Sequence, residues 1–173
     1  TICRYELRAL LVTEKCSVDP SERDGGAQLV ETLKTALGDS LSIMQFGPKG
    51  DPSATWHYEY PYSHSNRFER RLRNAHFIAE RIKSVEGSFT HVLFVHASMQ
   101  FGLSDHPLKP SITVWTFPMF LTPSYEASGE KVPGAYYALE KHTVKQSKNI
   151  LTPSHLEKQQ LMALYGVPKE SIH

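Results

Sequence analysis

The sequence predicts an α/β fold, in which helices cover both faces of an open, mainly parallel, Rossmann-like sheet. Short apolar runs alternate with segments of helical periodicity along the whole chain. Several of these apolar runs are continuous and contain β-branched residues. Strands of a parallel sheet, which are buried on both faces, have this composition. The length of 173 residues suits one domain with a large hydrophobic core.

Composition and charge narrow the class of protein. Hydrophobic residues make up 40% of the chain and charged residues 21%, as in soluble globular proteins. The net charge of +1 gives no reason to expect a nucleic-acid partner. Cys3 and Cys16 lack metal-site spacing, and neither a signal peptide nor an apolar run of membrane length is present, so a reduced cytoplasmic protein is expected. The sequence starts at Thr1 without Met and stops in mid-pattern at His173, which indicates a piece of a longer protein.

The first strand, loop and helix form the most informative stretch. Residues 9–12 are a short apolar run that predicts a buried strand. Residues 29–37 then place apolar side chains at helical spacing, with Asp24 as a helix cap and Gly38 as a stop. A strand, a loop and a helix in this order are typical of the start of an open α/β sheet.

Gly25 and Gly26 lie between that strand and that helix. Free N–H groups at a helix start bind phosphates and other anions, and glycine lets a ligand approach the backbone closely. The segment is neither a G-x-G-x-x-G motif nor a P-loop. The second interpretation is therefore that these glycines only turn the chain.

The remaining elements follow in order along the sequence. Strands are expected at 41–46, 56–60, 91–96, 111–116 and 149–152, the second of them near a sheet edge. Helices are expected from 66 to 85, from 134 to 147 and from 154 to 165, with a short helix or turn over 97–105. Asn66 with Glu69, and Ser154 with Glu157, have capping-box spacing, and Gly166 stops the last helix.

The expected helix up to residue 85 is basic outside its apolar face. Its cations are Arg67, Arg70, Arg71, Arg73, Arg81 and Lys83. Such a run of charge is usually a solvated helix surface. The functional interpretation is attraction to an anionic substrate or membrane surface.

Five segments carry a resemblance to a known family. They are L-L-V-T-E-K (10–15), D-G-G-A-Q-L-V-E-T-L (24–33), H-V-L-F-V-H (91–96), N-I-L-T-P-S (149–154) and L-Y-G-V-P-K-E-S-I (164–172). In this order they resemble the amino-terminal domain of retaining glycosyltransferases of the large group 1, or family 4, type, which have the two-domain GT-B fold. The resemblance covers residues 1–173 and implies an acceptor-side, Rossmann-like domain whose nucleotide-sugar-binding carboxyl-terminal domain is absent from this sequence.

The implied activity is transfer of a sugar from a nucleotide-sugar to an acceptor hydroxyl with retained anomeric configuration, in polysaccharide or glycoconjugate synthesis. The implied partners are the nucleotide-sugar, a carbohydrate or lipid-linked acceptor and the chain's own carboxyl-terminal domain, with no cofactor, metal or nucleic acid. A cytoplasmic location, with peripheral contact to the inner face of the membrane, is expected. The isolated domain should not catalyse, because two domains must close to exclude water.

The resemblance also implies site residues. Gly25 and Gly26 match the family's glycine loop, which lies over the donor phosphates and near the acceptor. His96 matches a histidine at the end of its strand, and Ser154 matches the serine that opens the helix after the T-P-S turn. At Thr116 and Phe117 the sequence departs from the family, which commonly has a histidine there, so acceptor contacts at these positions are expected to differ.

Residue chemistry points to three positions at the expected ends of strands. His96 is the candidate catalytic residue, because an imidazole near neutrality can share a proton with a hydroxyl nucleophile. Its other interpretation is a histidine satisfied by a backbone carbonyl. Glu14 and Lys15 end the first strand and face the same rim, where they either bind acceptor hydroxyls or pair with neighbouring residues in solvent.

Aromatic residues and a long connection are weaker candidates for acceptor binding. Four aromatic side chains share one parity and either stack on a sugar or pack against the sheet: Trp56, Tyr58, Tyr60 and Tyr62. Three residues of the connection 117–133 are candidates for shaping acceptor choice: Tyr125, Glu126 and Glu130.

Two other functions fit the same pattern. One is a different Rossmann-like nucleotide-binding enzyme domain, such as a sugar-nucleotide epimerase, which would bind a nucleotide on its own. The other is a carbohydrate-binding module that has kept the fold without the activity, which would bind a glycan without turnover.

Overall fold

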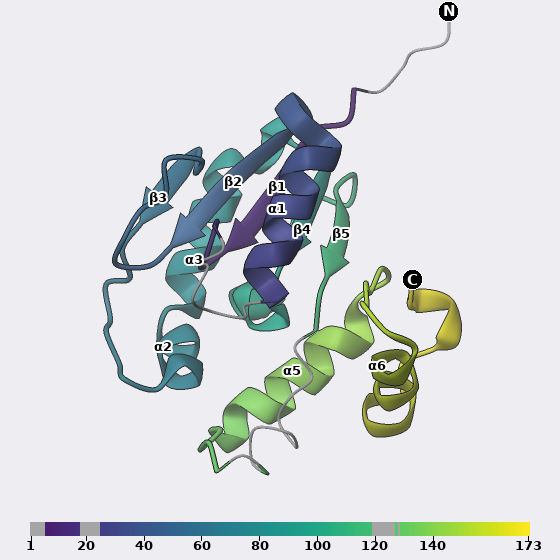
Figure 1. Ribbon diagram of the computed structural model, residues 1–173. Helices are drawn as coiled ribbons and strands as arrows, with labels where there is room; N and C mark the ends of the chain where they lie inside the picture. The colour runs from purple at the N-terminus through teal and green to yellow at the C-terminus, as the bar shows by residue number, and fades with distance from the viewer. Residues whose placement is uncertain (1–5, 18–24, 119–126, 128) are drawn as a thin grey trace, which may run out of the picture.

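All neighbouring strands of the sheet run parallel. The computed structural model describes residues 6–17, 25–118, 127 and 129–173. The strands are β1 (Ala9–Thr13), β2 (Leu41–Phe46), β3 (Trp56–Tyr58), β4 (His91–Phe94) and β5 (Thr113–Thr116). Their order across the sheet is β3-β2-β1-β4-β5 (Figure 1). Every pairing is parallel, which confirms the predicted α/β class.

Helices α1 (Gly25–Leu37) and α3 (Ala75–Val85) cover the two faces of this sheet. The other helices are α2 (Arg67–Arg73), α5 (Gly134–Gln146) and α6 (His155–Gln160). Short 3-10 segments are η1 (Gly38–Ser40), η2 (Glu86–Ser88), η3 (Ala97–Ser104) and η5 (Lys169–Ser171), and the π-helical turn η4 (Leu161–Tyr165) follows α6. Figure 1 shows α1 in front of the sheet and α3 behind it.

The central strand β1 contributes to the core on both faces. Leu10 and Val12 pack with Ile78 of α3, whereas Leu11 packs with Val30 of α1. All five residues of β1 are buried. A strand with two covered faces needs apolar residues at every position, which explains the continuous apolar run in the sequence.

The single helix expected from 66 to 85 is wrong, because the chain breaks it at Asn74. The backbone of Asn74 leaves the helical region, at φ −102° and ψ 6°. Its side-chain amide donates to the carbonyls of Arg70 and Tyr62, both at 2.7 Å, and its oxygen accepts from the N–H of Tyr62 at 3.2 Å. The side chain thus ties the helix break to the loop before α2, and asparagine commonly competes with helical hydrogen bonds in this way.

The helix start at Asn66 is confirmed, but the reciprocal half of the capping box is wrong. The side-chain oxygen of Asn66 accepts from the N–H groups of Phe68 (2.9 Å) and Glu69 (3.1 Å). The backbone N–H of Asn66 donates to Nδ1 of His64 instead of to Glu69. Glu69 forms an ion pair with Arg73 one turn later, at 3.0 Å.

The last expected strand is reduced to single bridges. Ile150 pairs in parallel with Thr116 on one side and with Ile172 on the other. Pro153 follows soon after and lacks the N–H that a longer ladder would need. The helix after it begins at the predicted cap, where Oγ of Ser154 accepts from the N–H of Glu157 at 3.2 Å. It ends at Gly166, as predicted, with φ +65°, a conformation that favours glycine.

Candidate functional site

The strand order reverses direction beside β1. The chain moves outward from β1 to β2 and β3, and then returns to place β4 on the other side of β1. In open α/β sheets such a switch point leaves a crevice at the carboxyl ends of the strands, and ligands bind there. Glu14 follows β1 at this edge and His96 lies two residues after β4, so both residues flank the switch point.

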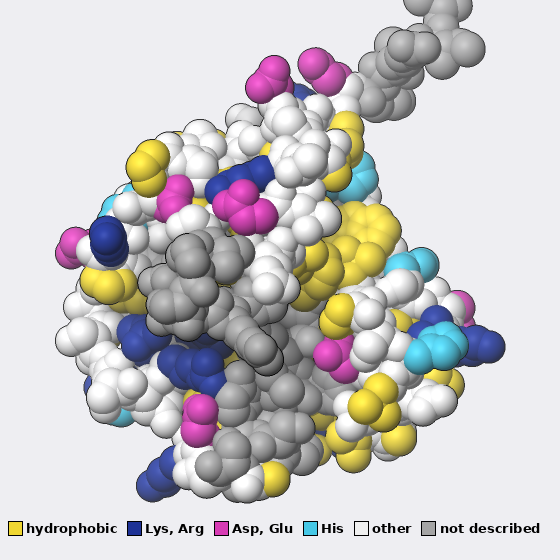
Figure 2. Space-filling view, in the orientation of Figure 1, with side chains coloured by type: hydrophobic (Ala, Val, Ile, Leu, Met, Phe, Trp, Pro, Cys, Tyr) yellow, Lys and Arg dark blue, Asp and Glu magenta, His cyan; other side chains and the backbone are white. Residues whose placement is uncertain are grey.

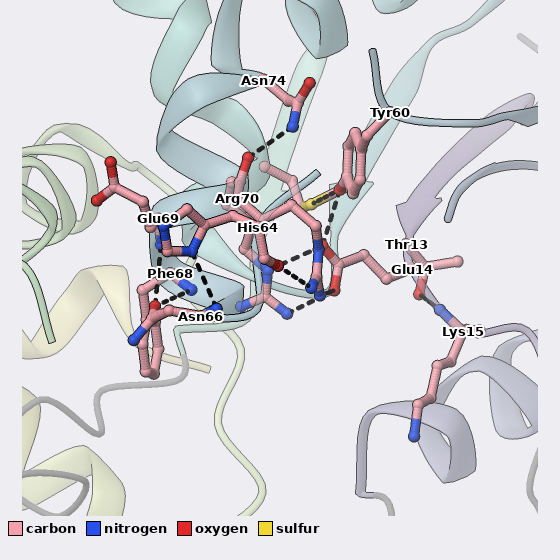
Figure 3. A network of polar contacts seen from close by, with 12 residues as sticks. Thr13, Glu14, Lys15, Tyr60, His64, Asn66, Phe68, Glu69, Arg70 and Asn74 are labelled. Atoms are coloured by element: carbon pink, nitrogen blue, oxygen red, sulfur yellow. Dashed lines mark hydrogen bonds and ion pairs between the residues drawn. The ribbon is translucent and has the colours of Figure 1, made fainter. Parts of the chain in front are cut away.

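Glu14 is held by a network of polar side chains (Figure 3). Nε of Arg71 donates to Oε1 of Glu14 at 3.0 Å, and Nη2 donates to Oε2 at 2.8 Å. The hydroxyl of Tyr60 donates to Oε1 at 2.8 Å. The turn that carries Glu14 is fixed by Thr13, whose hydroxyl accepts from the N–H of Lys15 and donates to its carbonyl. Such two-pronged arginine–carboxylate contacts give a defined orientation.

The network keeps Glu14 ionised. Burial alone would raise the pKa of Glu14, but the charge and hydrogen bonds of Arg71 outweigh it, and His96 and Tyr60 add to the effect, so that the pKa falls to about 2. Burial would lower the pKa of Arg71, yet Glu14 raises it above the ordinary value. Burial and then the charge of Glu14 raise the pKa of Tyr60. Tyr60 therefore stays a protonated donor beside a permanent carboxylate.

A hollow of about 490 Å³ opens beside this network, and we name it the β1–β2 hollow. Its lining includes Glu14, Lys15, Gln45, Lys49, Asp51 and Arg70. Gln45 shapes the wall, because its amide donates to the carbonyls of Glu14 (3.2 Å) and Lys49 (3.1 Å) and accepts from the N–H of Asp51 (2.8 Å). The volume lies within the range of small-molecule sites.

Glu14 and Lys15 lie at the rim where the sequence places them. Glu14 does form a pair, as the alternative interpretation expects, but its partner is the distant Arg71 and the pair lies away from solvent, with only 14% of the Glu14 side chain exposed. Lys15 is exposed and, like Glu14, lines the β1–β2 hollow. Their part in acceptor binding stays a prediction.

His96 lies directly before η3 and is half-buried. His96 is among the causes that lower the pKa of Glu14, so the two side chains are close enough to interact. The carbonyl of His96 accepts from the N–H of Met99 at 2.9 Å and thereby starts η3. The fold therefore brings His96 and Glu14 to the same part of the carboxyl edge, and the catalytic role of His96 stays a prediction.

The other predicted site residues are spread along the same edge. Gly25 and Gly26 are the first residues of α1 rather than a loop before it. Thr116 is fully buried, and its hydroxyl donates to Oε1 of Gln100 at 3.0 Å. Phe117 is half-buried and packs against the core on the α1 face. These positions leave the donor-phosphate and acceptor contacts of all four residues as predictions.

Ser154 is the cap of α6, and any ligand contact would be a second role. The parallel pairing of Ile150 with Thr116 directs the chain toward the carboxyl edge before it reaches Ser154. Glu130 is paired with Arg67 at 3.2 Å on the surface. Asp24, Tyr125 and Glu126 lie outside the described residues.

Three of the four aromatic candidates pack against the core, as the packing interpretation expects. Trp56, Tyr58 and Tyr60 contact the cluster that contains Phe46, and Tyr60 stacks on Phe46 with ring centroids 5.7 Å apart. Tyr62 is 60% exposed. The edge position of β3, predicted from the alternation, is confirmed.

Arg71 is the residue that sequence reasoning missed. The basic run around it predicts a solvated surface, yet Arg71 is only 4% exposed. The signal was present in the spacing, because Arg71 stands three residues after Phe68 and shares the inner face of α2. A cation in the apolar stripe of a helix predicts a buried anionic partner.

Within the described ranges, no group of three or more His, Cys, Asp or Glu side chains could hold a metal ion. None of the helices in that part of the chain is both long and apolar enough to cross a membrane.

Comparisons with known proteins give matches among solved structures. No protein-family model and no curated protein matches the sequence. Sucrose-phosphate synthase from Thermosynechococcus elongatus matches with a TM-score of 0.64 and 13% identity, over 91% of this chain and 45% of that one. The lipopolysaccharide outer core galactosyltransferase WaaB matches with a TM-score of 0.61 and 14% identity, over 96% and 44%. UGT2 of Phytolacca americana, in complex with UDP-2-fluoro-glucose and pterostilbene, matches with a TM-score of 0.52 and 11% identity, over 96% and 53%.

These matches establish the fold. The chain spans about half the length of each matched protein, and it has the fold of one domain of the GT-B glycosyltransferases.

Proposed function

We propose that this chain is the amino-terminal, acceptor-side domain of a retaining glycosyltransferase that transfers a sugar from a nucleotide-sugar to an acceptor hydroxyl. One observation carries the proposal. A GT-B-type sheet brings a largely buried, ionised Glu14, its partner Arg71 and an open hollow together at the carboxyl edge, beside the switch point. The fold alone would not carry a function, since one fold hosts many activities.

The acceptor lies in the β1–β2 hollow in this proposal. Glu14 accepts a hydrogen bond from an acceptor hydroxyl, and Arg71 and Tyr60 keep its carboxylate fixed. His96 lies on the β4 side of the switch point, where its imidazole takes the proton of the reacting hydroxyl. Lys15, Phe117 and Ser154 bound the acceptor side of the cleft, and the buried Thr116 supports this edge from within.

The donor phosphates lie at the start of α1, which Gly25 and Gly26 open. In the reaction, the bond between the anomeric carbon and the phosphate oxygen breaks, and the nucleoside diphosphate leaves with the electron pair. The acceptor oxygen forms the new bond to the same face of the sugar. Backbone N–H groups and the helix dipole at this end of α1 stabilise the charge on the departing diphosphate.

A second α/β domain holds most of the nucleotide-sugar in this proposal, and the reaction takes place between the two domains. This agrees with the span of about half of each matched structure. The chain by itself is then catalytically incomplete. The full-length protein is then a cytoplasmic enzyme, and it makes peripheral contact with a membrane when its acceptor is lipid-linked.

The test is an assay of the full-length protein that contains this chain, with a panel of nucleotide-sugars and hydroxyl acceptors. We expect release of a nucleoside diphosphate, and NMR of the product should show the anomeric configuration of the donor. His96→Ala should lower kcat by a factor of about 100 or more, as loss of a general base does. His76→Ala, at an exposed position on α3, is the matched control and should retain full activity.

Two outcomes would replace the proposal by an alternative. Tight nucleotide binding by the 173-residue chain alone, with no transfer by the full-length protein, would support a different nucleotide-binding enzyme. Binding of a glycan without turnover would support a carbohydrate-binding module.

A further inference from the structure

The charged side chains that line the β1–β2 hollow differ in how many hydrogen bonds and ion pairs they already form within the protein. Among the described residues, the lining carries two carboxylates, Glu14 and Asp51, and three cations, Lys15, Lys49 and Arg70. Both carboxylates are occupied by internal partners. Arg71 holds Glu14, whereas Ser53 donates to Asp51 from its N–H (2.8 Å) and its hydroxyl (2.6 Å).

Arg70 is the best placed of the cations. Its side chain is 30% exposed at the hollow, and Nη1 donates to the carbonyl of His64 at 3.2 Å. Nη2 stands 3.9 Å from Oε2 of Glu14, which is too long for a hydrogen bond, and Arg70 lines the hollow. A guanidinium has five N–H donors in a planar fork that matches a phosphate or carboxylate. Arg70 therefore has donors left to offer a ligand.

The three cations come from three separate elements around the hollow. Lys15 follows β1, Lys49 follows β2, and Arg70 is on α2. Lys49 is exposed. Figure 2 shows several Lys and Arg side chains on the left of the face that is drawn. Three cations and two carboxylates belong to the described part of the lining, and Arg71 compensates Glu14, so these residues present a net positive charge to a ligand.

We propose that the β1–β2 hollow binds an acceptor that carries a phosphate group, with the phosphate on Arg70 and Lys49. The inference rests on the proposed function, because it takes the ligand of this hollow to be the sugar acceptor. The phosphate is an anchor and is not consumed, and the acceptor hydroxyl reaches Glu14 from the same hollow. Two sources share this chemistry: a soluble sugar phosphate and the phosphate headgroup of a lipid.

The first arm of the test measures binding to the full-length protein by titration calorimetry. The probes are glucose 6-phosphate, glucose, inorganic phosphate and vesicles of phosphatidylglycerol or phosphatidylcholine. We expect either glucose 6-phosphate to bind at least tenfold more tightly than glucose and inorganic phosphate, or phosphatidylglycerol vesicles to bind where phosphatidylcholine vesicles do not. The first result identifies a soluble acceptor and the second a lipid. Equal binding of glucose and glucose 6-phosphate, with no vesicle preference, would overturn the inference.

The second arm uses variants. Arg70→Ala and Lys49→Ala should each weaken binding of the phosphorylated probe about tenfold and leave binding of glucose unchanged. Arg73→Ala is the matched control, since Arg73 is 55% exposed and pairs with Glu69. Lys49 lies in an exposed loop, so its variant still gives an answer if Arg70→Ala fails to fold. Equal losses for Arg73→Ala and the two test variants would show a general charge effect and overturn the assignment.

Transfer assays separate this inference from the proposed function. With a phosphorylated acceptor, Arg70→Ala should raise KM about tenfold with little change in kcat. If the enzyme uses neutral acceptors and Arg70→Ala does not change that transfer, the glycosyltransferase proposal holds and the proposal of a phosphorylated acceptor is wrong. If the hollow binds phosphate specifically but the protein transfers no sugar, the proposed function is wrong, whereas the assignment of the hollow as an anion-binding site holds.

Discussion

The carboxylate of Glu14 accepts two hydrogen bonds from the guanidinium of Arg71, which lies 57 residues later in the chain. The pair joins the carboxyl end of β1 to α2. Only 14% of the Glu14 side chain and 5% of the Arg71 side chain are exposed. A buried charge that loses its partner is strongly unfavourable, so this pair fixes how α2 lies against the sheet as well as the polarity of the candidate site.

Removing one member of this pair should destabilise the fold. Arg71→Met leaves the Glu14 carboxylate buried without its cation, and we expect the free energy of unfolding to fall by about 3–5 kcal/mol. Chemical denaturation at pH 7 measures the loss. Arg73→Met, on the exposed side of α2, is the control and should change stability by less than about 0.5 kcal/mol. An Arg71→Met protein as stable as the control would contradict a structural role for the pair.

The stabilisation from Glu14 should disappear in acid. The pKa of Glu14 is about 2 in the folded chain against an ordinary 4.5, so the stabilisation is complete above pH 4.5 and is lost as the pH falls to 2. The shift corresponds to about 3 kcal/mol. We expect the difference in unfolding free energy between the wild type and Glu14→Gln to be largest at neutral pH and to shrink through this window. A difference that stays constant from pH 6 to pH 2 would rule the linkage out.

Gly102 should not tolerate a side chain. A Cβ at this position of η3 would overlap the carbonyl oxygen of Ala75 at the start of α3. We expect Gly102→Ala to lower stability by about 1–3 kcal/mol through this clash. Gly134 is the matched control, because a Cβ there meets no atom of the described structure within 4 Å and α5 begins at that residue. Thermal unfolding should show a lower Tm for Gly102→Ala only.

The cap of α6 predicts a graded response at Ser154. Ser154→Ala removes the acceptor for the N–H of Glu157 and should cost about 1 kcal/mol, whereas Ser154→Asp keeps an acceptor and should cost little. Denaturant titration of both variants measures the difference. Equal stability of the two variants would mean that the cap hydrogen bond contributes nothing.

Cys16 should be unreactive in the folded chain. It is 1% exposed, and burial, with Asp51 as the next cause, raises the pKa of its thiol to about 12. Only the thiolate is a good nucleophile, so iodoacetamide at pH 8 should modify Cys16 in denaturant and leave it intact in buffer. Mass spectrometry of the peptide that contains Cys16 measures the fraction of the thiol that is modified. Rapid modification in buffer would show that the end of β1 opens easily.

The sheet was predictable from the sequence because its determinants are local. The run 9–12 has to be buried on both faces, and its alternate residues do face α1 and α3. The caps Asn66 and Ser154 were predictable for the same reason, since a capping side chain acts within its own first turn. The edge position of β3 followed from its alternating pattern.

The features that sequence reasoning missed depend on contacts distant in the chain. The helix break at Asn74 needs the backbone of Tyr62, which lies 12 residues earlier. The burial of Arg71 needs Glu14. The hydroxyl of Thr116 donates to the side chain of Gln100, and the two residues meet only in the folded chain, where η3 lies near the end of β5. Side-chain spacing along one element cannot show which atom lies opposite it.

The central place of β1 has a consequence during synthesis of the protein. Residues 9–13 are made before β2 and can pair with it as soon as it follows, but the opposite side of β1 waits for β4. The wait is long, since Arg8 and Thr90, which are bonded beside this pairing, lie 82 residues apart. Until then an apolar strand keeps an open edge, and open edges promote association between chains. The strand order therefore leaves one edge of β1 unpaired in the nascent chain until β4 has been made.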